Sequence, residues 1–263
     1  MNRKHTTFSI FVLFMVALLA LVTFVEAIPT GPTTDITITK SERLDTWGSK
    51  TTLAEAGNVS EFDTDSSSIT RTWQGYFGNI SGMIVLGDAL NNTLYDWSLA
   101  SPQGEIYAVS HVDSPDWYNV RCSSTAELEA EDIRINANQS VDEDTVNGTF
   151  VIGGSAEAQA NYGGPITHPT FYVANVTISN DTCPVAAMYN SSRLPSDNFK
   201  EVLLSDQATV PIIYTGIIAH TVNPYAESDG FDGRTHDFEM IVGEDGHFND
   251  LAPQTYWFYL ELE

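Results

Sequence analysis

Residues 236–242, with the sequence HDFEMIV, alternate between apolar and polar side chains. In an extended chain Phe238, Met240 and Val242 point to one side, and the acidic residues between them point to the other. Residues 256–262, with the sequence YWFYLEL, place Tyr256, Phe258, Leu260 and Leu262 on one face in the same way. A period of two with aromatic residues is typical of β-strands that bury one face. The chain is therefore predicted to be mainly β.

Other segments of strand-forming composition lie along most of the chain, separated by Gly, Pro, Asn and Asp. They are residues 35–40, 69–76, 80–86, 93–98, 105–110, 171–179, 198–204 and 212–218. A strand over 171–179 places Tyr172 and Ile178 on one face and Asn175 on the other. Strands of this length with short turns predict an antiparallel β-sandwich.

Helix is expected in a central insertion only. Ser124 and Glu127 have the spacing of a capping box, which predicts a short helix ending near Ile133. A second short turn is expected at 141–146, inside a polar loop insertion over residues 136–169. Strands precede and follow this insertion, and we expect one β-rich domain over residues 35–263 rather than two small domains.

The first 27 residues have the layout of a secretory signal peptide. Arg3 and Lys4 precede an apolar run over residues 8–25, and small residues end at Ala27. Cleavage after Ala27 would leave residues 28–34, rich in Pro, Gly and Thr, as a flexible N-terminus. The alternative is an uncleaved N-terminal anchor, because the run is long enough to span a membrane.

The sequence contains eight Asn-x-Ser/Thr triplets, against about three expected by chance for this glycan-acceptor motif. The acceptors are Asn58, Asn79, Asn91, Asn138, Asn147, Asn175, Asn180 and Asn190. With the signal peptide, this excess predicts a glycosylated protein at the cell surface or outside the cell, with no membrane contact after cleavage. The acceptors end at Asn190, so the last 70 or so residues would form a part of the surface without glycans.

Cys122 and Cys183 are the two cysteines of the chain. In an oxidising compartment an even pair favours a disulfide, and the loop of about 60 residues predicts roughly 4 kcal/mol of stabilisation. A metal pair and a catalytic thiol are weaker alternatives, since there is no CxxC spacing and no neighbouring His.

The formal net charge is −24, and loss of residues 1–27 leaves 9 basic residues against 34 acidic ones. Such a surface repels nucleic acids and anionic lipids, so neither is an expected partner. The simplest interpretation of the acidic residues is a solvated coat.

Residues 72–97 form the densest set of aromatic and amide side chains. Trp73, Tyr76, Tyr95 and Trp97 could form a platform on which sugar rings stack, although a role in the core is the stronger interpretation. The cluster Asp229, Asp232, Asp237, Glu239, Glu244, Asp245, Asn249 and Asp250, with His236 and His247, could hold a structural Ca²⁺. Its spacing matches no EF-hand loop, so no cofactor is predicted.

The run WQGYFGNISGMIVLGD over residues 73–88, followed by NTLYDW at 92–97, resembles a family of uncharacterised secreted archaeal cell-surface proteins. The resemblance extends over most of residues 40–263. It implies an extracellular location and a paired Cys122 and Cys183, and it brings no known activity and no catalytic residues.

No catalytic motif is found, and the G-x-S-x-G elbow of serine hydrolases is absent. We expect a structural or adhesive cell-surface protein without enzymatic activity, whose partners are envelope or surface-layer components or further copies of itself. Residues 28–40 could supply a donor strand for such assembly. The alternatives are a carbohydrate- or Ca²⁺-dependent binding module and, less favoured, a secreted hydrolase.

Overall fold

The structure is a computed structural model of a mainly β protein. It describes residues 28–32, 36–44, 49, 51, 53–61, 63–64, 67–98, 101–138, 142–152, 166–206, 212–223, 229–246 and 252–262. The predicted signal peptide therefore lies outside the described residues. No helix in these ranges is long and apolar enough to cross a membrane.

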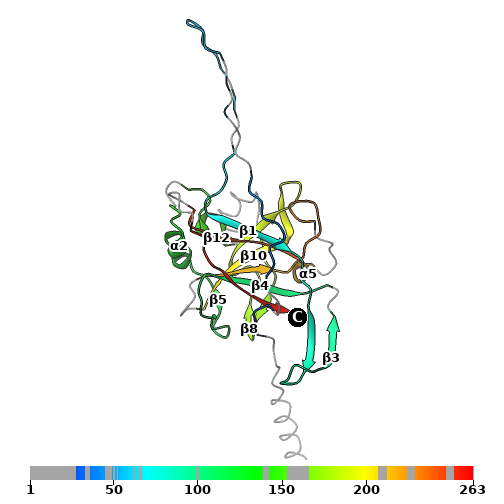
Figure 1. Cartoon of the computed structure of the whole chain (residues 1–263). Helices are drawn as coiled ribbons and strands as arrows, with labels where there is room; N and C mark the ends of the chain where they lie inside the picture. The colour runs from blue at the N-terminus through cyan, green and yellow to red at the C-terminus, as the bar shows by residue number, and fades with distance from the viewer. Residues whose placement is uncertain are drawn as a thin grey trace, which may run out of the picture.

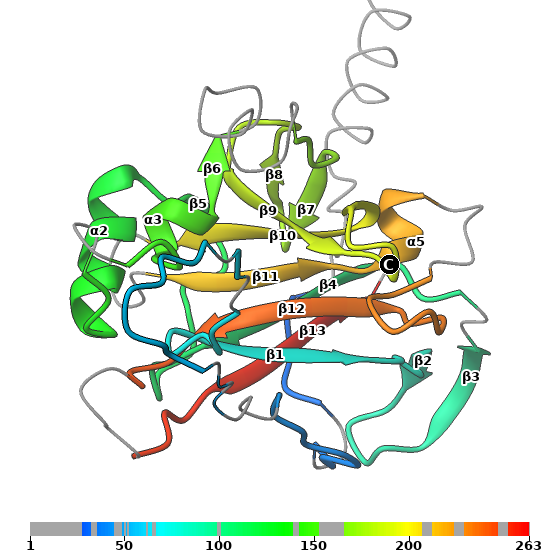
Figure 2. The ribbon, with the colours of Figure 1, turned by 90° about the horizontal axis from the view of Figure 1, so that it is seen from above.

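A seven-stranded antiparallel sheet forms the centre of the molecule (Figures 1 and 2). The strand order is β13-β4-β11-β10-β9-β6, and β5 also pairs with β10. The strands are β4 (Gly104–Val109), β5 (Arg121–Cys122), β6 (Val151–Ile152), β9 (Pro184–Tyr189), β10 (Pro195–Ser205), β11 (Ile213–Ile217) and β13 (Trp257–Leu262). Because β4 lies between β11 and β13, strands from both sides of the central insertion share one sheet.

Alternation along the central strands gives the sheet two apolar faces. Val202 and Leu204 belong to one buried cluster, and Leu203 between them belongs to the other. Tyr107 and Ala108 of β4 divide in the same way. Successive residues therefore point into different buried clusters, and these strands are covered on both faces.

A two-stranded ribbon covers one face of the sheet. It consists of β1 (Trp73–Gly78) and β12 (Phe238–Gly243), paired antiparallel. Met240 and Val242 are buried in the cluster that contains Leu203. The ribbon and the sheet make the β-sandwich arrangement that the sequence predicts. Contrary to expectation, Glu239 is buried too, and its carboxylate accepts a hydrogen bond from the backbone N–H of Phe231 at 2.9 Å.

The short hairpin of β7 (Phe171–Val173) and β8 (Val176–Ile178) packs on the opposite face. The single strand predicted over 171–179 is therefore wrong. Ala174 turns the chain with a φ of 50°. Tyr172 is exposed because it alternates with the buried Phe171 and Val173 along β7. Asn175 is exposed, as expected, but on the turn rather than on a strand. The predicted disulfide between Cys122 and Cys183 is confirmed.

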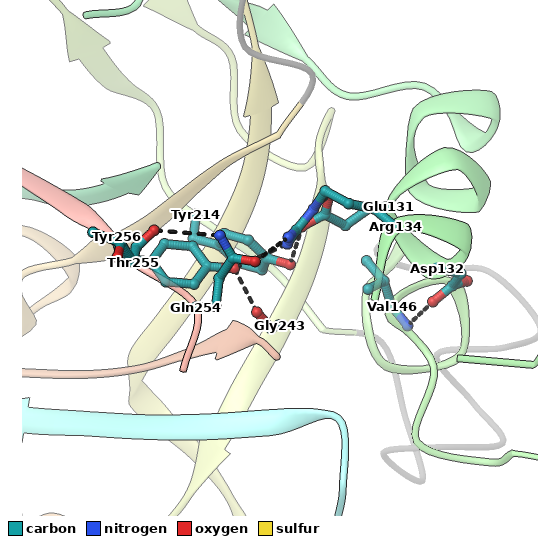
Figure 3. Close-up of polar contacts among 9 residues, drawn as sticks. All are labelled: Glu131, Asp132, Arg134, Val146, Tyr214, Gly243, Gln254, Thr255 and Tyr256. Atoms are coloured by element: carbon teal, nitrogen blue, oxygen red, sulfur yellow. Dashed lines mark hydrogen bonds and ion pairs between the residues drawn. The ribbon is translucent and has the colours of Figure 1, made fainter. Parts of the chain in front are cut away.

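The helix α2 (Thr125–Arg134) begins at the predicted capping box, where Glu127 accepts from the backbone N–H of Ser124 at 2.7 Å. Two short helices follow, α3 (Val146–Thr149) and α5 (Ala219–Val222). A buried network ties α2 to the sheet (Figure 3). The hydroxyl of Tyr214 donates to Glu131 at 2.8 Å, and Arg134 pairs with the same carboxylate.

The described part of the region 136–169 is more ordered than the predicted polar loop. It contains α3 and the edge strand β6. Val146 and Phe150 are buried in the core. Their apolar side chains are separated by polar residues, which hides them from a search for long apolar runs.

The hairpin of β2 (Met83–Gly87) and β3 (Thr93–Ser98) projects from the molecule beyond the end of β1 (Figure 2). Its base is fixed to the body at Ile80, whose backbone N–H donates to Asp237 at 2.6 Å. Close to the base, a Cβ on Gly82 would lie 2.3 Å from Cδ1 of Leu262, so a larger residue there would require the Leu262 side chain to move.

The strand predicted over residues 35–40 is wrong in its described part, and donation of that segment to another copy stays a prediction. Residues 36–40 form no strand, and Ile36 and Ile38 are exposed. Thr30, however, makes an isolated bridge to Leu260 on the outer edge of β13, with both backbone hydrogen bonds formed. The N-terminal segment thus contacts the sheet edge at one residue pair among those described.

Candidate binding cleft and projecting hairpin

A cleft of about 830 Å³ lies over the first half of β1. The segments 41–44 and 69–71, the start of β1, the end of β12 and residues 253–256 line it. These segments are distant in the sequence and meet because β1 pairs with β12 and β13 ends the main sheet.

Aromatic side chains form the floor of the cleft, and the fold holds each one in place. The indole N–H of Trp73 donates to the carbonyl of Asp144 at 2.7 Å, and its ring packs on Phe150. Tyr76 packs edge to face on Phe258, with 5.3 Å between ring centroids. These contacts leave the aromatic rings only partly exposed, so they form a rigid wall rather than free stacking faces.

Tyr256 is a third aromatic residue that lines the cleft, and it belongs to the network in Figure 3. Its hydroxyl donates to the carbonyl of Gly243 at 2.5 Å and accepts from Arg134 at 3.1 Å. Arg134 also donates to Gln254 at 3.0 Å, which fixes the amide beside it. Burial of Tyr256 raises the pKa of its phenol, so the hydroxyl stays protonated at neutral pH.

Charged side chains of both signs line the cleft, namely Glu42 and Glu244 together with Arg43 and Arg71. Both arginine side chains are exposed, and neither forms a salt bridge with a carboxylate of the described residues. By contrast Arg121, Arg134 and Arg234 are each paired with an acidic side chain. The cleft therefore offers both cationic and anionic groups to an occupant, and two of its arginines are free to contact one.

The projecting hairpin carries a separate apolar surface. Ile84 faces Trp97 across the two strands, and Leu86 faces Tyr95, so the four side chains share one face. Their exposed fractions are 41%, 49%, 52% and 59% in that order. The rings of Tyr95 and Trp97 also contact each other, with 4.9 Å between centroids. We call these four residues the hairpin face.

The four residues of the predicted sugar platform do not lie together in the structure. Trp73 and Tyr76 line the cleft, whereas Tyr95 and Trp97 lie on the hairpin beyond the other end of β1. Sequence reasoning also missed Arg43, Arg71 and Gln254. The two arginines carried a usable signal, because basic residues are rare in this chain.

The acidic cluster near the C-terminus serves local structure in the part described. Asp232 pairs with Arg234 and with His236, and these hydrogen bonds outweigh its desolvation and lower its pKa to about 2. Asp237 fixes Ile80, as noted above. Among the described residues no group of three or more His, Cys, Asp or Glu could hold a metal ion. His247, Asn249 and Asp250 lie outside the described residues, and the Ca²⁺ idea stays untested.

None of the eight acceptor asparagines is buried. Asn147 and Asn190 are half-buried, and the other six are exposed. Asn91 lies at the tip of the projecting hairpin with a φ of 62°, and Asn79 lies near its base. The placement is compatible with glycans at these positions.

No family model, curated protein or solved structure matches this chain. The resemblance to secreted archaeal surface proteins stays a prediction. The geometry defines a β-sandwich protein with a charged aromatic cleft and an exposed apolar hairpin.

Proposed function

We propose that this chain is a secreted, glycosylated structural or adhesive protein of the cell surface. The observation that carries the proposal is the set of eight glycan acceptors, none of which is buried. The signal-like N-terminus and the disulfide add support, because disulfides persist in oxidising compartments. The fold contributes a stable body from which the apolar hairpin projects.

Labelling of intact cells with a membrane-impermeant amine reagent tests the location. Lys40 is an exposed target, and its ammonium group lies 2.7 Å from the carboxylate of Glu42. Lys200 is a matched internal control, because it is buried and should stay unlabelled in folded protein wherever the protein is. The proposal expects mapped label on Lys40 before lysis. Label that enters Lys40 only after lysis would contradict it.

A carbohydrate-binding module is the second candidate, and the cleft favours it. Gln74 and Gln254 offer amides beside Tyr76 and Tyr256, and Arg71 could contact an acidic sugar. In this case the cell-surface protein would adhere through glycans.

Binding of purified protein to a glycan array, with and without a chelator, tests this candidate. Arg71→Ala should reduce binding, while Trp97→Ala, on the hairpin outside the cleft, should leave it unchanged. Loss of binding with chelator would bring back the Ca²⁺ hypothesis. A protein that binds no sugar under either condition removes the carbohydrate module.

A further inference from the structure

A buried histidine lies beside the disulfide. His168 is 2% exposed, and its ring packs edge-on against Phe171, with 6.0 Å between the ring centroids. It comes just before the hairpin β7–β8, on the face of the main sheet opposite the ribbon β1–β12 (Figure 2). Because a polar ring is costly to bury without partners, its two nitrogens need hydrogen bonds.

The contacts of His168 fix where its proton lies. Its Nδ1 is 2.9 Å from the carbonyl oxygen of Pro169, which can only accept, so Nδ1 carries the hydrogen. Its Nε2 is 3.1 Å from the backbone nitrogen of Thr182 and 3.1 Å from that of Cys183, and both of these nitrogens donate. Nε2 therefore accepts two hydrogen bonds, and the ring is neutral.

The same contacts join two segments of the chain. The backbone N–H of His168 donates to the carboxylate of Asp181 at 3.1 Å, and the backbone N–H of Asn180 donates to the hydroxyl of Thr170 at 3.1 Å. Asp181 has a φ of 59°, so the chain turns sharply here. Residues 168–170 and the turn 179–183 thus hold each other through His168. We call these contacts the His168 clasp.

A second proton on His168 is incompatible with the clasp. It would turn Nε2 from an acceptor into a donor that faces two N–H donors, those of Thr182 and Cys183. Both N–H groups would lose their acceptor, while the buried ring would gain a charge.

One charged group among the described residues favours the protonated ring. Burial lowers the pKa of His168, and the Pro169 carbonyl and the charge of Asp181 oppose this lowering without cancelling it. Both carboxylate oxygens of Asp181 already accept hydrogen bonds, from the N–H of His168 and from the side-chain amide of Asn180. The clasp therefore favours the neutral ring.

We propose that His168 is an acid-sensitive switch, whose neutral ring holds the turn 179–183 closed and whose protonation opens it. The turn carries the glycan acceptor Asn180 and one end of the disulfide, Cys183. Cys183 is fully buried in the closed turn, so opening would expose it. The inference goes beyond the proposed surface function and does not depend on it, because all of these contacts lie within one chain.

The closed turn is favoured at neutral pH and loses its advantage in acid. An ordinary histidine pKa of 6.5 applies to the open turn, and the closed turn has a lower pKa. The stability of the closed turn is therefore full above pH 6.5 and falls as the pH drops toward the lower pKa. Within that range, each pH unit shifts the ratio of open to closed turns about tenfold toward the open state.

Nitrogen-15 NMR of the unmodified chain tests the closed state without any variant. The expected spectrum at pH 7 shows the His168 ring neutral, with the hydrogen on Nδ1 and none on Nε2. A hydrogen on Nε2 at pH 7 would overturn the proposal, because Nε2 could not then accept from Thr182 and Cys183.

Amide hydrogen exchange at several pH values tests the opening. Relative to an unstructured peptide at the same pH, protection of the Thr182 and Cys183 amides should fall roughly tenfold or more between pH 7 and pH 4. The amides of Leu203 and Tyr214, a facing pair in the main sheet, should stay protected. Unchanged protection at Thr182 and Cys183, or an equal loss at all four amides, contradicts a local switch.

The variant His168→Gln separates the switch from other effects of acid. The glutamine amide oxygen can accept from the same two N–H groups but does not take up a proton in this range. Protection at Thr182 and Cys183 should then stay constant from pH 7 to pH 4. The matched control is His111→Gln, at a side chain that is 43% exposed, and it should lose protection as the unmodified chain does. A loss in His168→Gln equal to that in the control would overturn the proposal.

Discussion

Ile84 and Trp97 lie directly opposite each other on β2 and β3, and both are exposed on the same face of the hairpin. In the main sheet, facing pairs such as Val202 and Thr215 are buried. The same alternation that builds the core is therefore repeated on a hairpin that the single chain leaves uncovered.

The hairpin face should contribute little to the stability of the single chain. Trp97→Ser removes a half-exposed ring that has no core contact, so the free energy of unfolding should change by about 0.5 kcal/mol or less. Leu203→Ala in the buried cluster should cost about 2–5 kcal/mol. Urea unfolding of both variants makes the comparison. A large loss of unfolding free energy for Trp97→Ser would contradict this, because it would show that the ring packs against the body of the protein.

The disulfide should contribute substantially to stability. Cys122 and Cys183 are 61 residues apart, and a loop of that length predicts roughly 4 kcal/mol of stabilisation through the unfolded state. The double variant Cys122→Ser with Cys183→Ser should unfold at clearly lower urea concentration than the oxidised protein. Equal midpoints would show that the covalent link does not restrict the unfolded chain.

Glu239 should make the protein less stable as the pH rises toward neutrality. Burial raises its pKa from 4.5 to about 7, nearby Asp232 adds to the shift, and the N–H of Phe231 only partly offsets it. Between these two values the folded chain holds a proton that the unfolded chain has released. The contribution of Glu239 to the free energy of unfolding is therefore full below pH 4.5, falls as the pH rises to 7 and then levels off.

Glu239→Gln removes this contribution and should flatten the decline. Glu201 is also buried, and desolvation raises its pKa too, so some decline should remain in the variant. The difference between the two stability curves, measured by urea unfolding from pH 4 to pH 8, isolates Glu239. Parallel curves over that range would contradict the assignment.

Glu127 should have the opposite effect at lower pH. Its burial alone would raise the pKa, but hydrogen bonds from Arg121, Ser124 and Ser205 outweigh this and lower the pKa to about 2. The stabilisation is full above pH 4.5 and is lost as the pH falls toward 2. Glu127→Gln should lower the free energy of unfolding near pH 6. In acid, the difference in this free energy between the variant and the unmodified chain should become smaller. Glu129→Gln, two residues along the same helix at an exposed position, is the matched control.

Periodicity predicted most long strands because their burial follows the alternation of side chains. The strand at 93–98 was placed with its observed bounds, and those near 105–110 and 256–262 were placed within a residue or so. The strand β9, Pro184–Tyr189, was missed. It is buried on both faces and small residues fill it, so it shows no alternation.

The candidate site was less accessible from sequence. In the sequence, Trp73 and Trp97 belong to one aromatic stretch. In the structure, Trp73 begins β1, and Trp97 lies on the hairpin beyond the other end of that strand. The cleft depends on which distant segments the pairing of β1 with β12 brings together. The local sequence pattern carries no information on that pairing. The apolar run MIVL is visible in the sequence, but only the structure shows that it is exposed.

The most direct test of a secreted, glycosylated surface protein is the intact mass of the chain purified from its own cells, before and after reduction. The account predicts a chain that begins at Ile28, carries glycan mass on several of the eight acceptors, and gains two hydrogens when the bond between Cys122 and Cys183 is reduced. A mass equal to that of the full unmodified chain from Met1, unchanged by reduction, would contradict it.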